Sequence, residues 1–238
     1  MKKWLVYLLF FISPIINRAG SDKPNSKPDE KSMLFSEMQL ADIGLSEQVF
    51  QTALKGFSEL ENESKLQNPS IITIIDFSQS SNKKRMYVLD LVRKKILFNT
   101  YVAHGRNTGE EYAQHFSNET GSLKSSLGFY ITENSAIGSK VGLSLIIKGV
   151  EKGFNDHALQ REIIMHGASY ATEAFIRKNG RLGRSFGCPS VPPELIKPIS
   201  ETIKGGTCLF IYSPDDNYLC KSPVLHQATT TAQVMDRL

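Results

Sequence analysis

The sequence predicts a mainly β fold: a β-rich α+β domain whose antiparallel sheet forms a sandwich or an open barrel with a few short helices. Short runs rich in β-branched and aromatic residues recur from residue 69 onward, with polar or Gly-containing breaks between them. Two of these runs flank the polar segment 92–95, which indicates a hairpin. Helical periodicity is confined to a few segments. The β-prone runs span 71–77, 85–91, 96–103, 127–132, 143–147, 163–165 and 207–212.

The first 19 residues have the layout of an export signal. Lys2 and Lys3 precede an apolar run from Trp4 to Ile16, which is too short to span a bilayer comfortably. We therefore expect residues 1–19 to be a signal peptide, or an uncleaved anchor that tethers the protein to the membrane. In both cases the rest of the chain is expected to be periplasmic or secreted.

Two segments are expected between this signal and the main domain. Residues 20–44 are expected to form a flexible linker, because 20–32 are rich in Lys, Pro, Ser, Asp and Asn and cannot bury a core. A helix follows over 45–66, and Ser46 is suited to cap it. Its apolar residues fall on one face at helical spacing, which predicts that the helix packs on the main domain.

The composition fits one compact domain with short appendages. The chain has 238 residues, 40% of them hydrophobic. Residues 67–213 are expected to form the domain, with short helices over 168–178 and 193–204, and 214–238 a C-terminal tail. The net charge of +4 is too small and too evenly spread to indicate a nucleic-acid partner, and a monomer is expected.

Cys188 lies in a segment suited to present a side chain on a tight turn. Gly183, Gly187 and Pro189 constrain the backbone around it. Such a turn exposes backbone N–H groups, which can stabilise the negative charge that acyl transfer builds on a carbonyl oxygen. Cys208, by contrast, lies within an apolar run and is expected to be buried and inert. Cys188 is therefore the candidate nucleophile.

His166 is the candidate base. It ends the apolar run 163–165 and precedes Gly167, which places its imidazole at a strand edge where a loop can bring Cys188 close. A cysteine thiol needs a base to ionise near neutral pH, and histidine is the usual partner. Taken alone, His166 is better explained as a hydrogen-bonded core residue, but the glycine-flanked cysteine 22 positions later favours catalysis.

Two arginines and a second histidine complete the candidates. Arg184, and less so Arg181, offer planar guanidinium groups suited to peptide carboxylates; the alternative is that both are solvated surface residues. His104 precedes Gly105 at the end of the run 96–103, where it either lines the cleft or is bonded to backbone. No metal site is expected, since no metal-ligand spacing relates the remaining histidines, His115, His157 and His226.

These residues resemble those of a known family. The L,D-transpeptidases that share the YkuD fold carry His-Gly, then a loop, then Ser-x-Gly-Cys, which here become His166-Gly167 and Ser185-Phe-Gly-Cys188. The sequence is most similar to the murein L,D-transpeptidase branch of Bacteroidetes-like bacteria, as a Ser-x-Gly-Cys-Pro variant. The resemblance covers roughly residues 45–213, and includes the segments 74–78, 102–107, 116–118 and 125–130.

The resemblance implies a cell-wall enzyme that acts on peptidoglycan stem peptides and requires no metal or organic cofactor. Cys188 would attack the carbonyl that links the L-centre of a diamino acid to the following D-alanine, which gives an acyl-enzyme. His166 would take the thiol proton and return it to the leaving amine, while the Gly167 carbonyl orients the imidazole. Gly187 and Ser185 would support the oxyanion hole. Transfer of the acyl group to a neighbouring stem peptide would give a 3→3 cross-link.

The sequence departs from the family pattern at Phe186, where most relatives carry histidine, and at Pro189 and Ser190, which replace the apolar and Arg or Asn residues that often follow the cysteine. His104 is a candidate to replace the missing imidazole in part. Three alternatives remain. The same cysteine could serve an L,D-carboxypeptidase or endopeptidase that releases the acyl group to water, or the chain could be a non-catalytic peptidoglycan-binding scaffold. A papain-like peptidase is disfavoured, because its cysteine precedes its histidine.

Overall fold

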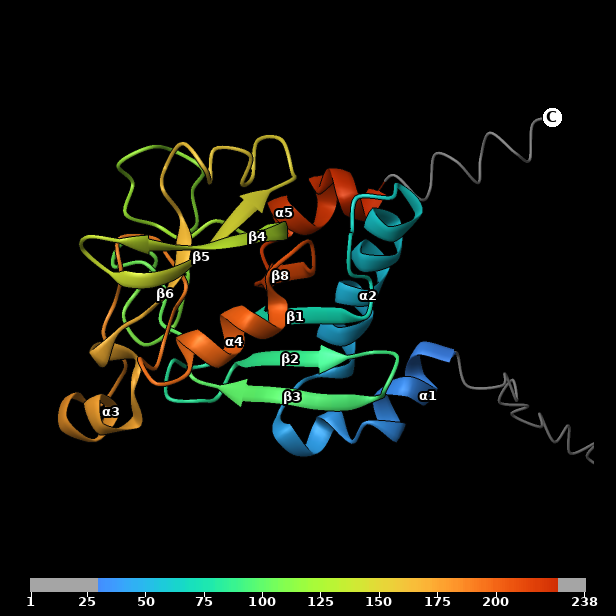
Figure 1. Ribbon diagram of the computed structural model, residues 1–238, viewed down its shortest axis with the longest axis horizontal. Coiled ribbons are helices and arrows are strands. Elements are labelled where there is room, and N and C mark those ends of the chain that lie inside the picture. The colour runs from blue at the N-terminus through green and yellow to red at the C-terminus, as the bar shows by residue number, and fades with distance from the viewer. Residues whose placement is uncertain (1–29, 227–238) are drawn as a thin grey trace, which may run out of the picture.

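A computed structural model of the protein describes residues 30–226, which form one eight-stranded sheet with short helices around it (Figure 1). The expected export signal, residues 1–19, lies outside the described residues. The strands are β1 (Ile71–Asp76), β2 (Met86–Asp90), β3 (Lys95–Thr100), β4 (Gly128–Gly138), β5 (Gly142–Gly149), β6 (Ile164–Gly167), β7 (Ser190–Val191) and β8 (Cys208–Tyr212). The helices are α1 (Glu30–Glu37), η1 (Leu40–Ile43), α2 (Glu47–Asn62), η2 (Ser169–Ala171), α3 (Glu173–Asn179), α4 (Ile196–Ile203) and α5 (Asp216–Lys221).

The sheet is nearly closed into a barrel, which confirms the predicted β-rich fold class. Its strand order is β3-β2-β1-β8-β4-β5-β6-β7. In Figure 1, β1 and β8 lie between the β2–β3 hairpin and the β4–β5 hairpin. The two outer edges meet where the Ala103 N–H donates to the Ser190 carbonyl at 2.8 Å and the Ser190 N–H donates back at 3.2 Å. Ser190 belongs to β7, so this closure lies beside the strand that follows Cys188.

Two strand pairs are parallel within this otherwise antiparallel sheet. They are β1 with β8 and β6 with β7. Every residue of β1 and of β8 is buried, as expected for central strands covered on both faces. The β-prone runs predict β1, β6 and β8 but not β7. They also do not predict the parallel direction, because a parallel pair is joined by a long crossover whose path local sequence does not specify.

The helices form where the sequence supplies caps and apolar stripes. The Ser46 hydroxyl accepts the Val49 N–H at 3.3 Å at the start of α2, and the stripe of α2 is buried against β1 and β8. Gly56 allows this close approach, because a Cβ there would collide with the Phe129 ring of β4. Helix α4 buries Ile196, Ile199 and Ile203 and contacts β1, β4, β5 and β6.

The segment expected to be a linker is helical over its described part. Residues 30–43 form α1 and η1, which bury Phe35 and Leu40. The Phe35 ring lies 5.7 Å from the ring of Phe50 in α2, centroid to centroid. The expected linker boundary at residue 44 is therefore wrong for residues 30–44. The polar composition of residues 20–32 predicts a linker, but a few apolar side chains just after this segment can pack on α2.

The expected C-terminal tail also packs on the domain over its described part, residues 214–226. Helix α5 buries Tyr218, and Val224 and Leu225 are buried after it. Glu151, itself buried, accepts hydrogen bonds from the Phe129 N–H at 2.6 Å, from the Tyr218 hydroxyl at 2.9 Å and from the Ser222 hydroxyl. Burial raises the pKa of Glu151, and these donors oppose the rise. The tail assignment is thus wrong for 214–226, since its polar residues are partners for one buried carboxyl.

Tyr218→Phe is expected to lower the free energy of unfolding by about 1–3 kcal/mol, because Glu151 loses a donor inside the protein. Urea unfolding followed by circular dichroism measures the change. Tyr112→Phe is the matched control, since Tyr112 is 52% exposed and should leave stability unchanged. Equal stability of the two variants would show that Glu151 does not depend on Tyr218.

Within residues 30–226, no helix is long and apolar enough to cross a bilayer.

Candidate functional site

The pairing of β6 with β7 brings the candidate base and the candidate nucleophile together. His166 lies opposite Ser190 in the parallel register, and Gly167 lies opposite Val191. The His166 N–H also donates to the carbonyl of Pro189, the residue after Cys188, at 3.4 Å. His166 therefore lies on β6, and Cys188 lies two residues before β7, the strand that pairs with β6.

The His166 imidazole is held at both nitrogens. Its Nδ1 lies 3.1 Å from the Gly167 carbonyl oxygen, and its Nε2 lies 3.1 Å from the Ser190 hydroxyl. A carbonyl oxygen only accepts, so Nδ1 carries the hydrogen and Nε2 of the neutral ring carries the lone pair. The side chain is buried, at 6% exposure. The Gly167 carbonyl thus has the geometry to orient the ring, and Nε2 is the atom that can accept a proton.

The Cys188 thiol is partly buried beside the start of β6. Its Sγ donates to the Glu162 carbonyl oxygen at 3.7 Å. At rest the thiol therefore bonds to a main-chain carbonyl, while the Ser190 hydroxyl is the partner of His166 Nε2. Burial raises the pKa of the Cys188 thiol, and the Ile164 N–H and the Arg161 guanidinium oppose the rise. The net result is a thiol that is protonated at neutral pH and needs a base to react.

The loop that carries Cys188 is fixed by its own hydrogen bonds. The Ser185 hydroxyl donates to the Cys188 carbonyl at 2.6 Å and accepts the Gly187 N–H at 3.0 Å. The Gly187 carbonyl accepts the Ser125 hydroxyl at 2.9 Å. Gly187 has φ of +130°, and a Cβ there would lie 2.9 Å from the Lys124 carbonyl oxygen, so glycine is required. Ser185 therefore supports the loop, and the Gly187 N–H is engaged by it.

Arg161 is a component of the site that nothing in the local sequence indicates. Its Nη2 lies 3.5 Å from where a Cβ on Gly187 would be, which places its charge against the loop of Cys188. Arg161 is found only in the fold, because its partners are oxygen atoms of a distant loop. They are the carbonyls of Ser117 (2.7 Å) and Lys124 (2.6 Å) and the hydroxyls of Ser126 (2.5 Å) and Ser122 (3.2 Å).

A pocket of about 270 Å³ opens beside the thiol. Glu162, whose carbonyl accepts the Cys188 thiol, and Phe186 of the cysteine loop both line it. Phe186 is 69% exposed, and the Arg106 guanidinium lies 5.8 Å from its ring centre. Phe186, which replaces the family's histidine, therefore contributes an exposed apolar surface to the pocket and cannot donate a proton. The remaining lining residues are Thr120, Gly121, Leu123, Gln160, Arg161 and Ile163.

His104 is buried and faces away from solvent, at 1% exposure. Its Nδ1 lies 2.8 Å from Nη2 of the buried Arg85, and its Nε2 lies 3.2 Å from the Gly109 carbonyl oxygen. Burial and the charge of Arg85 lower the pKa of His104 to about 3, so the ring is neutral. This arrangement fits the backbone-bonded alternative. The His104 carbonyl does accept the Ser185 N–H at 3.0 Å, so the residue supports the cysteine loop through its main chain.

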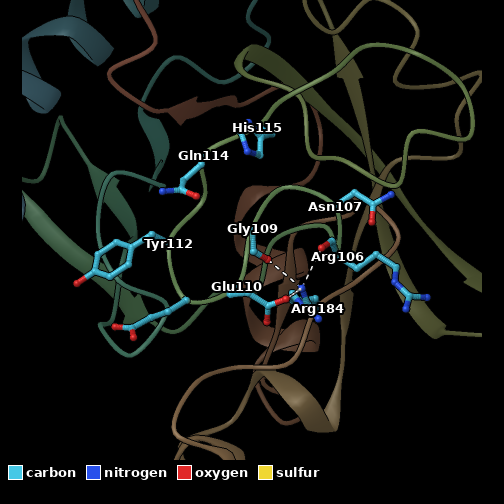
Figure 2. Close-up of a pocket in the computed structure, with 9 residues that line it drawn as sticks. Arg106, Asn107, Gly109, Glu110, Tyr112, Gln114, His115 and Arg184 are labelled. Atoms are coloured by element: carbon cyan, nitrogen blue, oxygen red, sulfur yellow. Dashed lines mark hydrogen bonds and ion pairs between the residues drawn. The ribbon is translucent and has the colours of Figure 1, made fainter.

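Arg184 and Arg181 are held by a carboxylate of the protein. Glu110 lies 2.6 Å from Arg184 Nη1 and 2.5 Å from Arg181 Nη2. Figure 2 shows Arg184 directed at Glu110 and at the Gly109 carbonyl, on the wall of a second pocket of about 380 Å³. A peptide carboxylate would have to compete with Glu110 for Arg184. Within residues 30–226, no group of three or more His, Cys, Asp or Glu side chains is placed to hold a metal ion.

The raised pKa of the Cys188 thiol predicts how its rate of alkylation depends on pH. In a Cys220→Ala background, which removes the exposed cysteine, alkylation by iodoacetamide should accelerate with pH, with an apparent pKa above the usual thiol value of about 8.5. Arg161→Gln should move this profile to higher pH, because the guanidinium favours the thiolate. Arg93→Gln, on the exposed β2–β3 turn, is the control. If the apparent pKa of alkylation is the same in Arg161→Gln as in the parent protein, the charge of Arg161 does not stabilise the Cys188 thiolate.

Several solved structures resemble this one. The structure is similar to an L,D-transpeptidase from Mycobacterium smegmatis (8% identity, TM-score 0.39, covering 60% of this chain and 59% of that one). It is also similar to the helical cell shape determining protein Pgp2 from Campylobacter jejuni (14%, 0.42, 68% and 54%) and to an L,D-transpeptidase from Xylanimonas cellulosilytica (15%, 0.35, 75% and 92%). The chain thus spans less than two thirds of the length of the first two.

The sequence matches none of the curated proteins with which it was compared. Residues 41–212, most of the chain, match the L,D-transpeptidase catalytic domain, YkuD_2. The match includes both His166 and Cys188. The chain therefore belongs to the L,D-transpeptidase family.

Proposed function

We propose that the protein is a peptidoglycan L,D-transpeptidase that forms 3→3 cross-links through an acyl-enzyme on Cys188, with His166 as general base. The observation that supports the proposal is the β6–β7 pairing, in which His166 lies opposite Ser190 and its N–H donates to the carbonyl of Pro189, the residue after Cys188. The family membership supports the reaction class, since this domain is that of the L,D-transpeptidases.

The proposed first step is acylation. The Cys188 side chain turns from the Glu162 carbonyl toward His166 and transfers its proton to Nε2 as the sulfur attacks the carbonyl of the donor stem peptide. The Gly167 carbonyl stabilises the imidazolium through its bond with Nδ1. His166 then gives the proton to the departing D-alanine amine. The S–H bond breaks, the C–S bond forms, and the original C–N bond breaks.

The second step transfers the acyl group. A side-chain amine of a neighbouring stem peptide attacks the thioester, loses a proton to His166, and leaves Cys188 as a thiol after that proton returns. The exposed Phe186 and the pocket of about 270 Å³ beside it offer an apolar wall for the incoming chain. Peptidoglycan lies outside the cytoplasmic membrane, which agrees with the export signal expected in residues 1–19.

The acceptor decides between the proposed function and its close alternative, an L,D-carboxypeptidase or endopeptidase that releases the acyl group to water. Purified protein is incubated with peptidoglycan stem peptides, and the muropeptides are separated and identified by mass. Cross-linked dimers with a 3→3 bond are the expected product. Shortened monomers without dimers would overturn transpeptidation and support hydrolysis.

A carbapenem tests the nucleophile directly. A related enzyme, LdtMt1, is known in complex with imipenem, and the proposed function predicts a covalent adduct here at Cys188. Intact-protein and peptide mass spectrometry detect it. If no adduct forms at any pH, the non-catalytic scaffold, which has lost turnover, becomes the better explanation.

A further inference from the structure

A chain of two hydroxyl groups begins at the His166 ring. The Ser190 hydroxyl lies 3.1 Å from His166 Nε2 and also 3.1 Å from the Tyr170 hydroxyl. Ser190 is fully buried, whereas Tyr170 is half-buried. Neither residue has a role in the steps described above.

The direction of each hydrogen bond follows from the Gly167 carbonyl. Because that carbonyl fixes the hydrogen on Nδ1, Nε2 accepts and the Ser190 hydroxyl donates to it. The Ser190 oxygen then accepts from the Tyr170 hydroxyl. At rest, the chain therefore runs from Tyr170 through Ser190 to the one atom of His166 that has to accept the thiol proton.

The backbone holds both hydroxyl groups in place. Ser190 lies opposite His166 in the β6–β7 register and is bonded through its main chain to Ala103. The Tyr170 carbonyl accepts the Gly183 N–H at 2.8 Å, which ties Tyr170 to the segment that leads to Cys188. A Cβ at Gly183 would lie 2.9 Å from Cγ of the Tyr170 ring, so the ring packs directly on this segment.

We propose that Ser190 and Tyr170 are positioning residues that hold His166 Nε2 ready as an acceptor and then stabilise the imidazolium by reversing their hydrogen bonds. The proposal rests on the proposed function of the same site. It assigns a role to the position after Pro189 where relatives often carry Arg or Asn, and it does so from contacts of this chain alone.

The reversal follows from the single lone pair of Nε2. The Ser190 hydroxyl must rotate away from Nε2 before the thiol proton arrives. Its hydrogen can then be donated to the Tyr170 oxygen. The Tyr170 hydrogen turns away from Ser190 in the same event. The thiol proton then moves from Sγ to Nε2, and the new N–H has the Ser190 oxygen as its acceptor until the proton leaves with the departing amine. One S–H bond is exchanged for one N–H bond, and both hydroxyl groups keep their hydrogen.

The chain also predicts dependence of one residue on the other. Tyr170 acts on His166 only through Ser190, so removing its hydroxyl should matter only while the Ser190 hydroxyl is present. The Tyr170 hydroxyl stays protonated near neutral pH, because burial raises its pKa. It is therefore available as a donor throughout the range in which the enzyme would work.

The test is the kinetics of carbapenem acylation in four proteins: wild type, Ser190→Ala, Tyr170→Phe and the double variant. The rate constant at saturating carbapenem should fall about tenfold in each single variant, since each loses one hydrogen bond of the chain. The concentration for half-saturation should stay unchanged. The double variant should be no slower than Ser190→Ala, and Ser190→Thr, which keeps the hydroxyl, should recover most of the rate.

Ser169→Ala, next to Tyr170 but exposed, is the control and should match wild type. The proposal is overturned if the single losses multiply in the double variant, or if only half-saturation changes. Should Ser190→Ala or Ser190→Thr fail to fold, Tyr170→Phe alone decides by its rate constant, because Tyr170 is only half-buried and phenylalanine keeps its ring. Absence of an adduct in wild type would refute the proposed function. An adduct in wild type with normal rates in the variants would refute this inference only.

Discussion

Cys188→Ala is expected to abolish both the carbapenem adduct and the formation of cross-linked muropeptides, with a loss of more than about 10³-fold. The proposed function assigns the acyl-enzyme to this thiol, which alanine removes. Alanine keeps the backbone of the loop, which is fixed by Ser185 and Ser125 rather than by the sulfur. Mass spectrometry of the intact protein and muropeptide separation measure the two effects.

Cys220→Ala is the control for this experiment. Cys220 is exposed on α5, and Cys208 is buried in β8, where burial strongly raises the thiol pKa. The Cys220→Ala variant should be labelled as fully as wild type. An adduct that persists in Cys188→Ala and is lost in Cys220→Ala would place the reactive thiol on α5 and refute the site described here.

His166→Ala is expected to slow acylation by about 10²–10⁴-fold at neutral pH, because the protonated thiol loses its general base. The defect should narrow as pH rises, since hydroxide then generates the thiolate that the histidine no longer provides. The acylation rate is measured against pH in both proteins. This pH dependence separates loss of a base from collapse of the site, which would depress the rate equally at every pH.

His226→Ala serves as the matched control, because His226 is exposed and contacts only the Leu219 carbonyl at 2.8 Å. It should behave as wild type across the pH range. If His166→Ala keeps the wild-type rate at neutral pH, another group takes the thiol proton. His104 would not be that group, because burial and the charge of Arg85 lower its pKa to about 3 and both of its ring nitrogens already have partners.

The fold could be predicted as far as local pattern reaches. The hairpin of β2 and β3 forms where the two β-prone runs flank residues 92–95, and α2 begins beside Ser46. The parallel pairs could not be predicted, because they depend on which distant strands meet. The helices at 30–43 and at 216–221 were missed for a related reason, since their stability comes from contacts with α2 and with Glu151 rather than from their own periodicity.

The site divides in the same way. The glycines next to Cys188 and His166 make both residues recognisable candidates in the sequence. Gly187 in particular predicts a tight turn before the cysteine. Arg161 has no such mark, because it binds main-chain and hydroxyl oxygens of a loop more than thirty residues away in the chain. Ser190 and Tyr170 are 20 residues apart, and only the fold brings the Ser190 hydroxyl to the histidine and the Tyr170 hydroxyl to Ser190.

The two hydrogen bonds between Ala103 and Ser190 that close the barrel have a dynamic consequence. This seam lies beside a strand of only two residues, so transient local opening is expected to begin there. Such an opening would free the main chain of Ser190 from Ala103 while Ser190 stays paired with His166 of β6. A bound acyl group that fills the neighbouring pocket would hold the seam shut, and amide hydrogen exchange at Ala103 and Ser190 should then slow in the acylated enzyme.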